Sequence, residues 1–229
     1  MRLLLFDIDG TLVSARGAGR RALKTALERV FGTAGPIEAY DLRGKTDPRI
    51  VFDVMEAAGL GKDAVKARLD DLFETYARAL VGEIDGGQGV VTMPGVTDLL
   101  RRLAATEGVL LGLLTGNIEE GARIKLEPPG LWPYFLVGAF GSDDAERRRL
   151  PSLAARRAQA LTGYGFRPED VAVIGDTPHD IDCARAFGAL AVAVATGQYA
   201  REQLLAERPD LFFDDLADVD RVATALLAP

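Results

Sequence analysis

Several residue types are scarce in this 229-residue sequence, and each scarcity excludes a class of function. The one cysteine, Cys183, excludes an internal disulfide and a cysteine-rich zinc site, and it fits a reducing compartment. The one histidine, His179, excludes a metal site built from several histidines and makes a Ser-His-Asp triad untenable unless that residue serves alone. The formal net charge of −7 argues against a general nucleic-acid binder, which usually has a basic face.

Long apolar runs are also missing. No run approaches the about 18 residues of a membrane span, and the N-terminus shows no cleavage pattern of a signal peptide. We therefore expect a cytoplasmic protein with neither a membrane nor a nucleic acid as partner. Hydrophobic content of 48% and charged content of 27% are typical of a globular chain that buries a core.

The start of the chain combines an apolar run with a polar end. Leu3 to Phe6 is short and unbroken, which predicts a central strand of a parallel sheet that is covered on both faces. Asp7-Ile8-Asp9-Gly10-Thr11 follows directly. Two carboxylates this close resist ionising together, and a divalent cation or a shared proton would relieve the conflict. By itself the pattern also fits a polar Asx-type turn.

The rest of the chain alternates strand and helix, with one exception. Apolar runs predict further strands at 109–114, 135–140, 171–174, 189–195 and 211–213. Residues 15–89 show only helical spacing, at about 19–31, 48–58, 62–70 and 71–81. We therefore expect an α/β fold, a Rossmann-like doubly wound parallel sheet formed by residues 1–14 and 90–229, with an all-helical domain inserted at 15–89. Glycine-rich stretches at 14–19 and 82–89 predict hinges on either side of the insertion.

Three predicted strands end in a compact polar signature. These signatures are Asp7 to Thr11, Thr115-Gly116-Asn117, and Gly175-Asp176 through Asp180. Because the carboxyl ends of parallel strands meet at one edge of a sheet, we expect the three to converge. Hard oxygen ligands favour Mg²⁺, which commonly takes a few protein carboxylates together with a substrate phosphate. This composition suits phosphoryl transfer, in which catalysis is mainly positioning and charge neutralisation.

These motifs resemble those of the haloacid dehalogenase superfamily, specifically its phosphatases with a helical cap, the phosphoglycolate phosphatase and β-phosphoglucomutase groups. The first family motif, DxDGT, is matched by Asp7 to Thr11. The second, an apolar strand ending in Ser or Thr, is matched by Leu111 to Thr115, and the fourth, GDxxxD, by Gly175 to Asp180. The place of the helical insertion agrees as well, so the resemblance covers essentially the whole chain.

The resemblance implies a Mg²⁺-dependent phosphomonoester hydrolase that acts on a small phosphorylated metabolite through an aspartyl-phosphate. Asp7 would be the nucleophile, and Asp9 the general acid and base. Asp7, the backbone carbonyl of Asp9, and Asp176 would hold Mg²⁺, with Asp180 as a direct or outer ligand. The transferring phosphoryl group would be bound by Thr115 and the neighbouring N–H groups of Gly116 and Asn117.

The cation that contacts the phosphoryl group departs from the family pattern. The third motif is usually a Lys, but no Lys lies in the relevant stretch after Lys125. Arg147, Arg148 or Arg149 would supply the charge instead, and Arg147 agrees best with relatives. Lys125, on the helix after Thr115, is the competitor. At least two of the three arginines are expected to be solvated at the start of a helix.

Arg43, Gly44, Lys45 and Thr46 lie in the cap loop that selects the substrate in relatives, although loop charges are often simply solvated. His179 is expected to orient its loop or to cap the next helix. Dehalogenases and phosphonatases lack the second Asp of the first motif, so Asp9 argues against both. A mutase of the β-phosphoglucomutase kind and a catalytically silent binding protein stay open as alternatives. Phosphoglycolate is suggested by family analogy alone, and monomer and homodimer are both compatible with the sequence.

Overall fold

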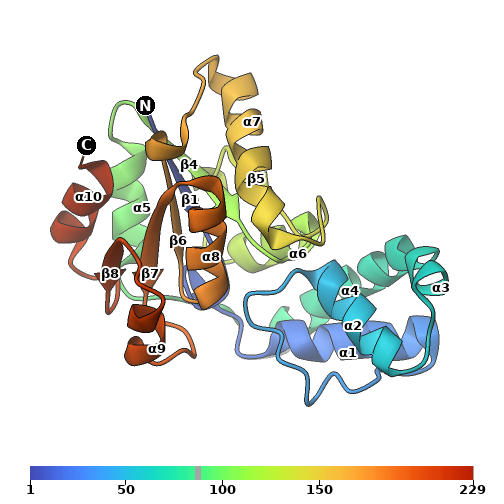
Figure 1. Ribbon diagram of the computed structural model, residues 1–229. Coiled ribbons are helices and arrows are strands. Elements are labelled where there is room, and N and C mark those ends of the chain that lie inside the picture. Colours follow the sequence, from blue (N-terminus) through green and yellow to red (C-terminus); the bar gives the residue numbers. More distant parts are fainter. Residues whose placement is uncertain (86–88, 229) are drawn as a thin grey trace.

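The computed structural model describes residues 1–85 and 89–228 and contains a six-stranded parallel sheet (Figure 1). Its strands are β1 (Arg2–Phe6), β4 (Val109–Leu114), β5 (Val137–Ala139), β6 (Val171–Gly175), β7 (Leu190–Val194) and β8 (Leu211–Phe213). They lie in the order β5-β4-β1-β6-β7-β8. This is the order of a doubly wound sheet, in which ligands bind where the chain switches from one side of the first strand to the other. The predicted α/β fold is confirmed.

β1 is a central strand with both faces buried. Leu4 and Phe6 point into one core of the sheet, and Leu3 and Leu5 into the other. Because neither face meets water, the strand is apolar throughout instead of alternating with polar residues. β1 pairs in parallel with β4 on one side and with β6 on the other.

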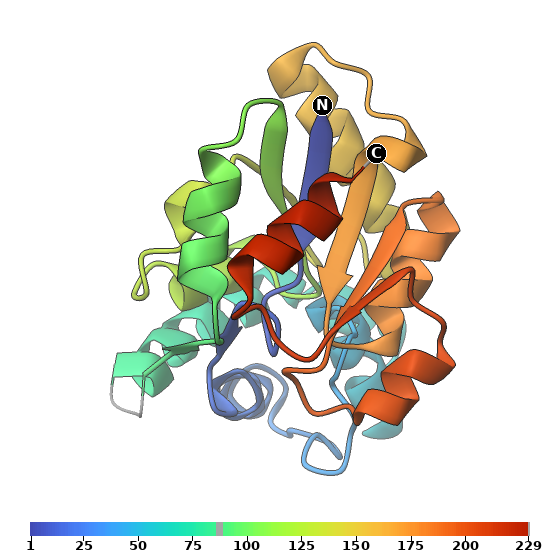
Figure 2. The ribbon, with the colours of Figure 1, turned by 90° about the vertical axis from the view of Figure 1, so that its left-hand side faces the viewer.

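Helices cover the two faces of the sheet, as Figure 2 shows. α5 (Val96–Ala104) and α10 (Val219–Leu227) pack on the face that contains Leu4 and Phe6. α7 (Leu150–Thr162), α8 (Pro178–Phe187) and the short α9 (Arg201–Ala206) contribute to the opposite core. α9 was not predicted, because a helix of six residues with one buried side chain, Leu204, shows no period.

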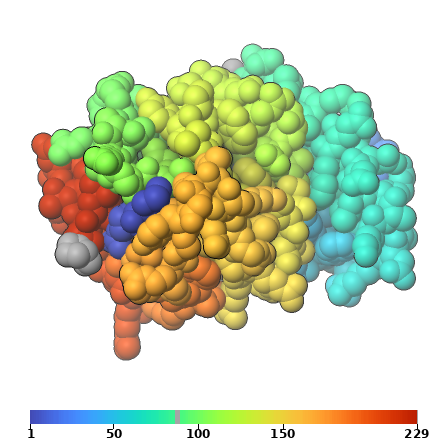
Figure 3. Space-filling model, turned by 90° about the horizontal axis from the view of Figure 1, so that it is seen from above, coloured from blue at the N-terminus to red at the C-terminus, as the bar shows by residue number. Residues whose placement is uncertain are grey.

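Four further helices gather at one end of the molecule, beyond the carboxyl edge of the sheet (Figures 1 and 3). They are α1 (Ala18–Phe31), α2 (Asp47–Ala57), α3 (Lys62–Lys66) and α4 (Leu69–Asp85). The predicted apolar face of α1 is buried in a cluster with the buried face of α4. This cluster is distinct from the two cores of the sheet, and Ile118, just before α6 (Glu119–Leu126), also joins it.

The connections to these helices differ from the prediction. A two-stranded antiparallel sheet lies where the chain leaves the six-stranded sheet for the helical cluster and returns from it. Its strands are Val13–Ser14 (β2) and Val91–Thr92 (β3), and each is too short to show alternation in the sequence. The predicted hinge at 82–89 is wrong over 82–85, because these residues are the last turn of α4, and 86–88 lie outside the described residues. In the hinge predicted at 14–19, only 15–17 lie outside regular elements. No helix in the described ranges is long and apolar enough to cross a membrane.

Separate clusters make the two-domain division testable by local stability. Leu27 is fully buried in the helical cluster, and Leu100 is fully buried against the sheet. Leu27→Ala should cost about 2–5 kcal/mol by leaving a cavity, and hydrogen exchange followed by mass spectrometry should accelerate in α1–α4 while β1, β4 and β6 stay protected. Leu100→Ala, the matched control, removes the same side chain from the sheet core. It should not make hydrogen exchange in α1–α4 faster relative to exchange in the sheet. Equal loss of protection throughout in both variants would contradict the division.

Candidate active site

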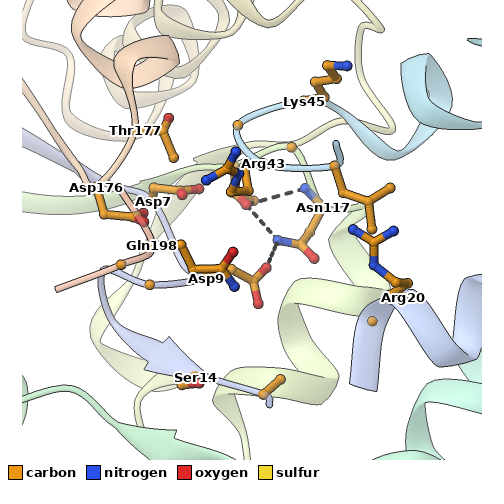
Figure 4. A pocket seen from close by; sticks show the side chains of 18 of the residues that line it. Asp7, Asp9, Ser14, Arg20, Arg43, Lys45, Asn117, Asp176, Thr177 and Gln198 are labelled. Carbon is orange, nitrogen blue, oxygen red and sulfur yellow. Dashed lines mark hydrogen bonds between the residues drawn. The ribbon is translucent and has the colours of Figure 1, made fainter. Parts of the chain in front are cut away.

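A cavity of about 340 Å³ lies between the carboxyl edge of the sheet and the helical cluster (Figure 4). Its walls come from the ends of β1, β4, β6 and β7, from the start of α1, and from the loop before α2. Most of the predicted site residues line it: Asp7, Asp9, Arg43, Gly44, Lys45, Thr115, Gly116, Asn117, Lys125, Arg147 and Asp176. Asp180 and Thr46 do not. Three signatures that are far apart in the sequence are therefore brought together.

The turn after β1 holds two carboxylates in different surroundings. Asp7 is buried and its N–H donates to the carbonyl of Ile174 on β6, whereas the side chain of Asp9 is 46% exposed. Gly10 has φ +87°, and a Cβ at this position would clash with the carboxylate of Asp176. Only glycine meets both conditions comfortably. The hydroxyl of Thr11 donates to Asp176 Oδ1 at 3.1 Å, so the end of the motif fixes a carboxylate from another strand.

Asp7, Asp176 and Asp180 form a buried carboxylate cluster, with one oxygen of each within 4.8 Å of the others. Within the described residues, the guanidinium of Arg147 is the one group that forms ion pairs with any of them, at 2.5 Å from Asp180 Oδ1 and 3.1 Å from Asp7 Oδ1. Burial raises the pKa of Asp7 to about 7 despite the opposing charge of Arg147. Burial and the charges of Asp7 and Asp180 also hold the pKa of Asp176 well above its ordinary value. Uncompensated negative charge on oxygen ligands makes this cluster compatible with a divalent metal.

Asp180 is fully engaged by the protein. Its Oδ2 accepts hydrogen bonds from the N–H and the hydroxyl of Thr177, the cap of α8, and its Oδ1 accepts from Arg147. Asp180 therefore has two roles, because it orients Arg147 and also caps the start of α8 together with Thr177. His179, beside it, does not cap the helix but lies against Gly44 of the loop before α2.

Of the three consecutive arginines, Arg147 alone reaches the site. They form a 3₁₀ turn before α7, which directs their side chains differently. Arg148 and Arg149 are exposed and pair with the surface residues Asp182 and Asp144. Arg147 is buried, and its Nε is the one buried side-chain polar atom without a hydrogen-bond partner in the part of the chain that the structure describes.

A second polar network surrounds Asp9. Lys125 Nζ lies 2.6 Å from Asp9 Oδ2 and 2.6 Å from Asn117 Oδ1. The amide nitrogen of Asn117 donates to Asp9 Oδ2 and to the hydroxyl of Thr115, both at 2.8 Å (Figure 4). The end of β4 and helix α6 thus act together on the second carboxylate of the first motif.

The loop before α2 and the first residue of α2 bind main-chain groups of the sheet domain. The N–H of Asp47 donates to the carbonyl of Gly116 at 2.7 Å, and a Cβ on Gly116 would clash with the carbonyl of Lys45. The carboxylate of Asp47 accepts from the N–H of Ile118 at 2.9 Å. The hydroxyl of Thr46 donates to the carbonyl of Ala145, so this side chain binds the sheet domain and not the cavity, which differs from the prediction for it.

The side chains of Arg43 and Lys45 line the cavity, and other residues orient them. Both N–H groups of Arg43 that face Asp41 donate to it at 2.8 Å, and its guanidinium lies 4.4 Å from the centre of the Tyr199 ring. Lys45 Nζ lies 4.0 Å from the centre of the Tyr40 ring. The cation–π contact of Lys45 holds its positive charge in place without neutralising it, whereas the charge of Arg43 is paired with that of Asp41.

Sequence reasoning missed several residues of the cavity. Asp47, Thr177 and the segment 196–198 line it, as do Arg20 and Tyr76 of the helical cluster. The segment 196–198 lies one residue beyond the end of β7 (Leu190–Val194), so the rule that polar residues at strand ends mark a site would have found it. The hydroxyl of Thr196 donates to the carbonyl of Gly10 at 2.6 Å. For Arg20 and Tyr76 the sequence carried no signal, because they lie within helices of the inserted region and follow no strand.

The chain is similar to known proteins over its whole length. The family model of haloacid dehalogenase-like hydrolases matches residues 1–188. The chain is 33% identical to a phosphoglycolate phosphatase of Synechococcus elongatus, covering 99% of each chain. It is 31% identical to a phosphoglycolate phosphatase of Rhodospirillum rubrum, covering 95% of this chain and 89% of the other. The crystal structure of a hydrolase from Pseudomonas syringae, 20% identical, covers both chains completely with a TM-score of 0.75, which supports the fold.

The raised pKa of Asp7 predicts how stability depends on pH in the absence of metal. Its pKa is about 7 in the folded protein against an ordinary value of 3.8. The folded state therefore holds an extra proton between about pH 4 and pH 7, and the stability that this contributes is lost as the pH rises through that window, by about 1.4 kcal/mol per unit.

In urea unfolding with EDTA at pH 5, 6, 7 and 8, the stability of the wild type should therefore fall with rising pH relative to that of Asp7→Asn, in which residue 7 is neutral at every pH. Addition of a divalent cation at neutral pH should stabilise the wild type over Asp7→Asn, because only the carboxylate can bind the cation. Parallel stability curves for the two proteins in EDTA would show that the fold does not perturb Asp7.

Proposed function

The chain belongs to the haloacid dehalogenase-like hydrolase family, in its phosphoglycolate phosphatase and β-phosphoglucomutase-like group, and we propose that it is a Mg²⁺-dependent phosphatase of a small phosphorylated metabolite. The observation that carries this proposal is the asymmetric pair at the end of β1. Asp7 is buried against two further carboxylates and Arg147, whereas Asp9 faces the cavity. A nucleophile and a proton carrier need these two surroundings.

In the proposed reaction, a carboxylate oxygen of Asp7 attacks phosphorus and the bond to the ester oxygen breaks. Asp9 gives its proton to the departing oxygen, so that an alcohol leaves and an aspartyl-phosphate remains on Asp7. Asp9 then takes a proton from a water molecule that attacks the same phosphorus. The bond between phosphorus and Asp7 breaks, inorganic phosphate leaves, and both carboxyl groups return to their first state.

Asp7, Asp176 and the backbone carbonyl of Asp9 would hold Mg²⁺, with Asp180 outside the direct ligands because both of its oxygens are already hydrogen-bonded. When bound, the ion would neutralise the carboxylate cluster and the phosphoryl oxygens. Arg147, oriented by Asp180, would approach the phosphoryl group from the same side, offering the geometry of a guanidinium in place of the point charge of Lys.

Thr115 and the N–H groups of Gly116 and Asn117 would bind the remaining phosphoryl oxygens. Their place at the end of β4 supports this, since this strand is the immediate neighbour of β1. We further propose that residues 15–89 form the cap domain. Arg43 and Lys45, both at the cavity, would favour a substrate with an additional negative charge, and phosphoglycolate is the first candidate.

Release of inorganic phosphate from a panel of small phosphate esters, with Mg²⁺ or with EDTA, tests the proposal. Turnover should require Mg²⁺, disappear in Asp7→Asn, and fall about 10²–10⁴-fold in Asp9→Asn, the usual contribution of a general acid and base. Asp182→Asn is the matched control, because Asp182 is paired with Arg148 at the surface. A folded wild type that binds Mg²⁺ and hydrolyses no ester would contradict the phosphatase and favour a mutase or a silent binding protein.

The loop residues generate a separate prediction about selectivity. Arg43→Gln and Lys45→Gln should raise the KM for phosphoglycolate roughly tenfold or more, as expected for the loss of a hydrogen bond to a charged group. The kcat should change little, because neither residue contacts the carboxylate cluster. Lys24→Gln, which removes an exposed lysine of α1, is the control. An unchanged KM in both loop variants would show that these charges are only solvated.

A further inference from the structure

Lys125 is a buried lysine that the proposed reaction does not yet use. Its side chain is 4% exposed, and it lies on the buried face of α6 beside Ala122 and Leu126. Removing an ammonium group from water is costly unless charges and hydrogen bonds compensate for it. Lysine is accordingly seldom fully buried without a partner. The partners of Lys125 therefore indicate its role.

Those partners form a closed network at the cavity. Lys125 Nζ donates to Asp9 Oδ2 and to Asn117 Oδ1, both at 2.6 Å. Asn117 donates in turn to the same Asp9 Oδ2 and to the hydroxyl of Thr115. The oxygen of the Asn117 amide faces a donor and its nitrogen faces two acceptors, so the network has one consistent orientation.

The network acts on one oxygen of Asp9 only. Oδ2 accepts two hydrogen bonds, whereas Oδ1 accepts none from the residues that the structure describes. Two donors on one oxygen restrict the rotation of the carboxyl group, and they leave Oδ1 of this half-exposed, cavity-lining side chain without a protein donor in the described ranges. Proton transfer requires this kind of fixed approach to the leaving oxygen.

The two buried cations of the site have different partners. Arg147 pairs with Asp7 and Asp180, at the nucleophile. Lys125 pairs with Asp9, and this is its one ion pair within the described ranges. We propose that Lys125 is a positioning residue for the general acid and base Asp9, and that it does not bind the transferring phosphoryl group. This inference rests on the proposed phosphatase function.

The chemistry of the leaving group can show whether a cation positions the general acid or binds the phosphoryl group. The departing oxygen of an alkyl ester needs a proton as its bond to phosphorus breaks, whereas p-nitrophenolate leaves as a stable anion. The ratio kcat/KM covers only the steps up to the first irreversible one, which is the transfer to Asp7. A residue that positions the acid therefore affects alkyl esters selectively, and one that binds the phosphoryl group affects both kinds alike.

The experiment compares Lys125→Met with Arg123→Met, which removes an exposed cation from the same helix. The substrates are n-butyl phosphate and p-nitrophenyl phosphate, and inorganic phosphate serves as a competitive inhibitor. For Lys125→Met we expect kcat/KM to fall roughly 10²-fold on the alkyl ester, and less than about threefold on the aryl ester, within the range of general acid catalysis. The inhibition constant of phosphate should not change, and Arg123→Met should resemble the wild type on both esters.

Equal losses on the two esters, or weaker inhibition by phosphate, would overturn the inference in favour of phosphoryl binding. No loss on either ester would overturn it as well. Lys125→Gln, which keeps a polar group at this buried position, provides the same comparison where Lys125→Met does not fold. A folded wild type that hydrolyses no ester of the panel described above, these two included, would refute the proposed function itself, and the inference would fall with it.

Discussion

The mutual repulsion of buried carboxylates at the end of β1 is the constraint on which the rest of this structure depends. Asp7 and Asp176 follow the neighbouring strands β1 and β6, and Asp180 lies in the first turn of α8. In the described part of the chain, Arg147 is the one residue that forms ion pairs with any of these three carboxylates. Burial in a parallel sheet makes this arrangement unfavourable without a cation, because desolvation disfavours every ionised carboxylate. The central position of β1, the absent side chain of Gly10 and the cap of α8 all serve to hold these groups together despite their repulsion.

The two carboxylates of the first motif have separate electrostatic surroundings although one residue lies between them. Asp7 shares Arg147 with Asp180, whereas Asp9 shares Lys125 with Asn117. Strand geometry explains the separation, since the chain turns after β1 and the second carboxylate leaves the sheet edge toward α6. One short turn thus carries a buried carboxylate and a half-exposed one, each paired with a different cation.

How much of the site was predictable depends on where each residue lies in the chain. Asp7, Thr115 and Asp176 directly follow apolar strands, and the parallel sheet alone makes such positions converge. For the cation, the sequence left three consecutive arginines and Lys125, and only the resemblance to relatives favoured Arg147. Local geometry could not choose among the arginines, because the directions of consecutive side chains in a 3₁₀ turn depend on packing. Arg20 and Tyr76 reach the cavity only because helices of the inserted region dock there, and docking is long-range information that no local pattern contains. The same reason applies to β2 and β3, which are defined by their pairing and not by their two residues each.

The loop before α2 meets the sheet edge through acceptors and donors that belong to the main chain, at Gly116, Ile118 and Ala145. Main-chain groups are the same in every amino acid, so side-chain changes at 118 and 145 leave this docking chemistry available. Gly116 is the exception, because any side chain there would strike the carbonyl of Lys45. The attachment of the loop is therefore separated from the charges that it carries. Arg43 and Lys45 could therefore be exchanged during evolution, and the charge that lines the cavity with them, without rebuilding the contacts that hold the loop beside Asp7.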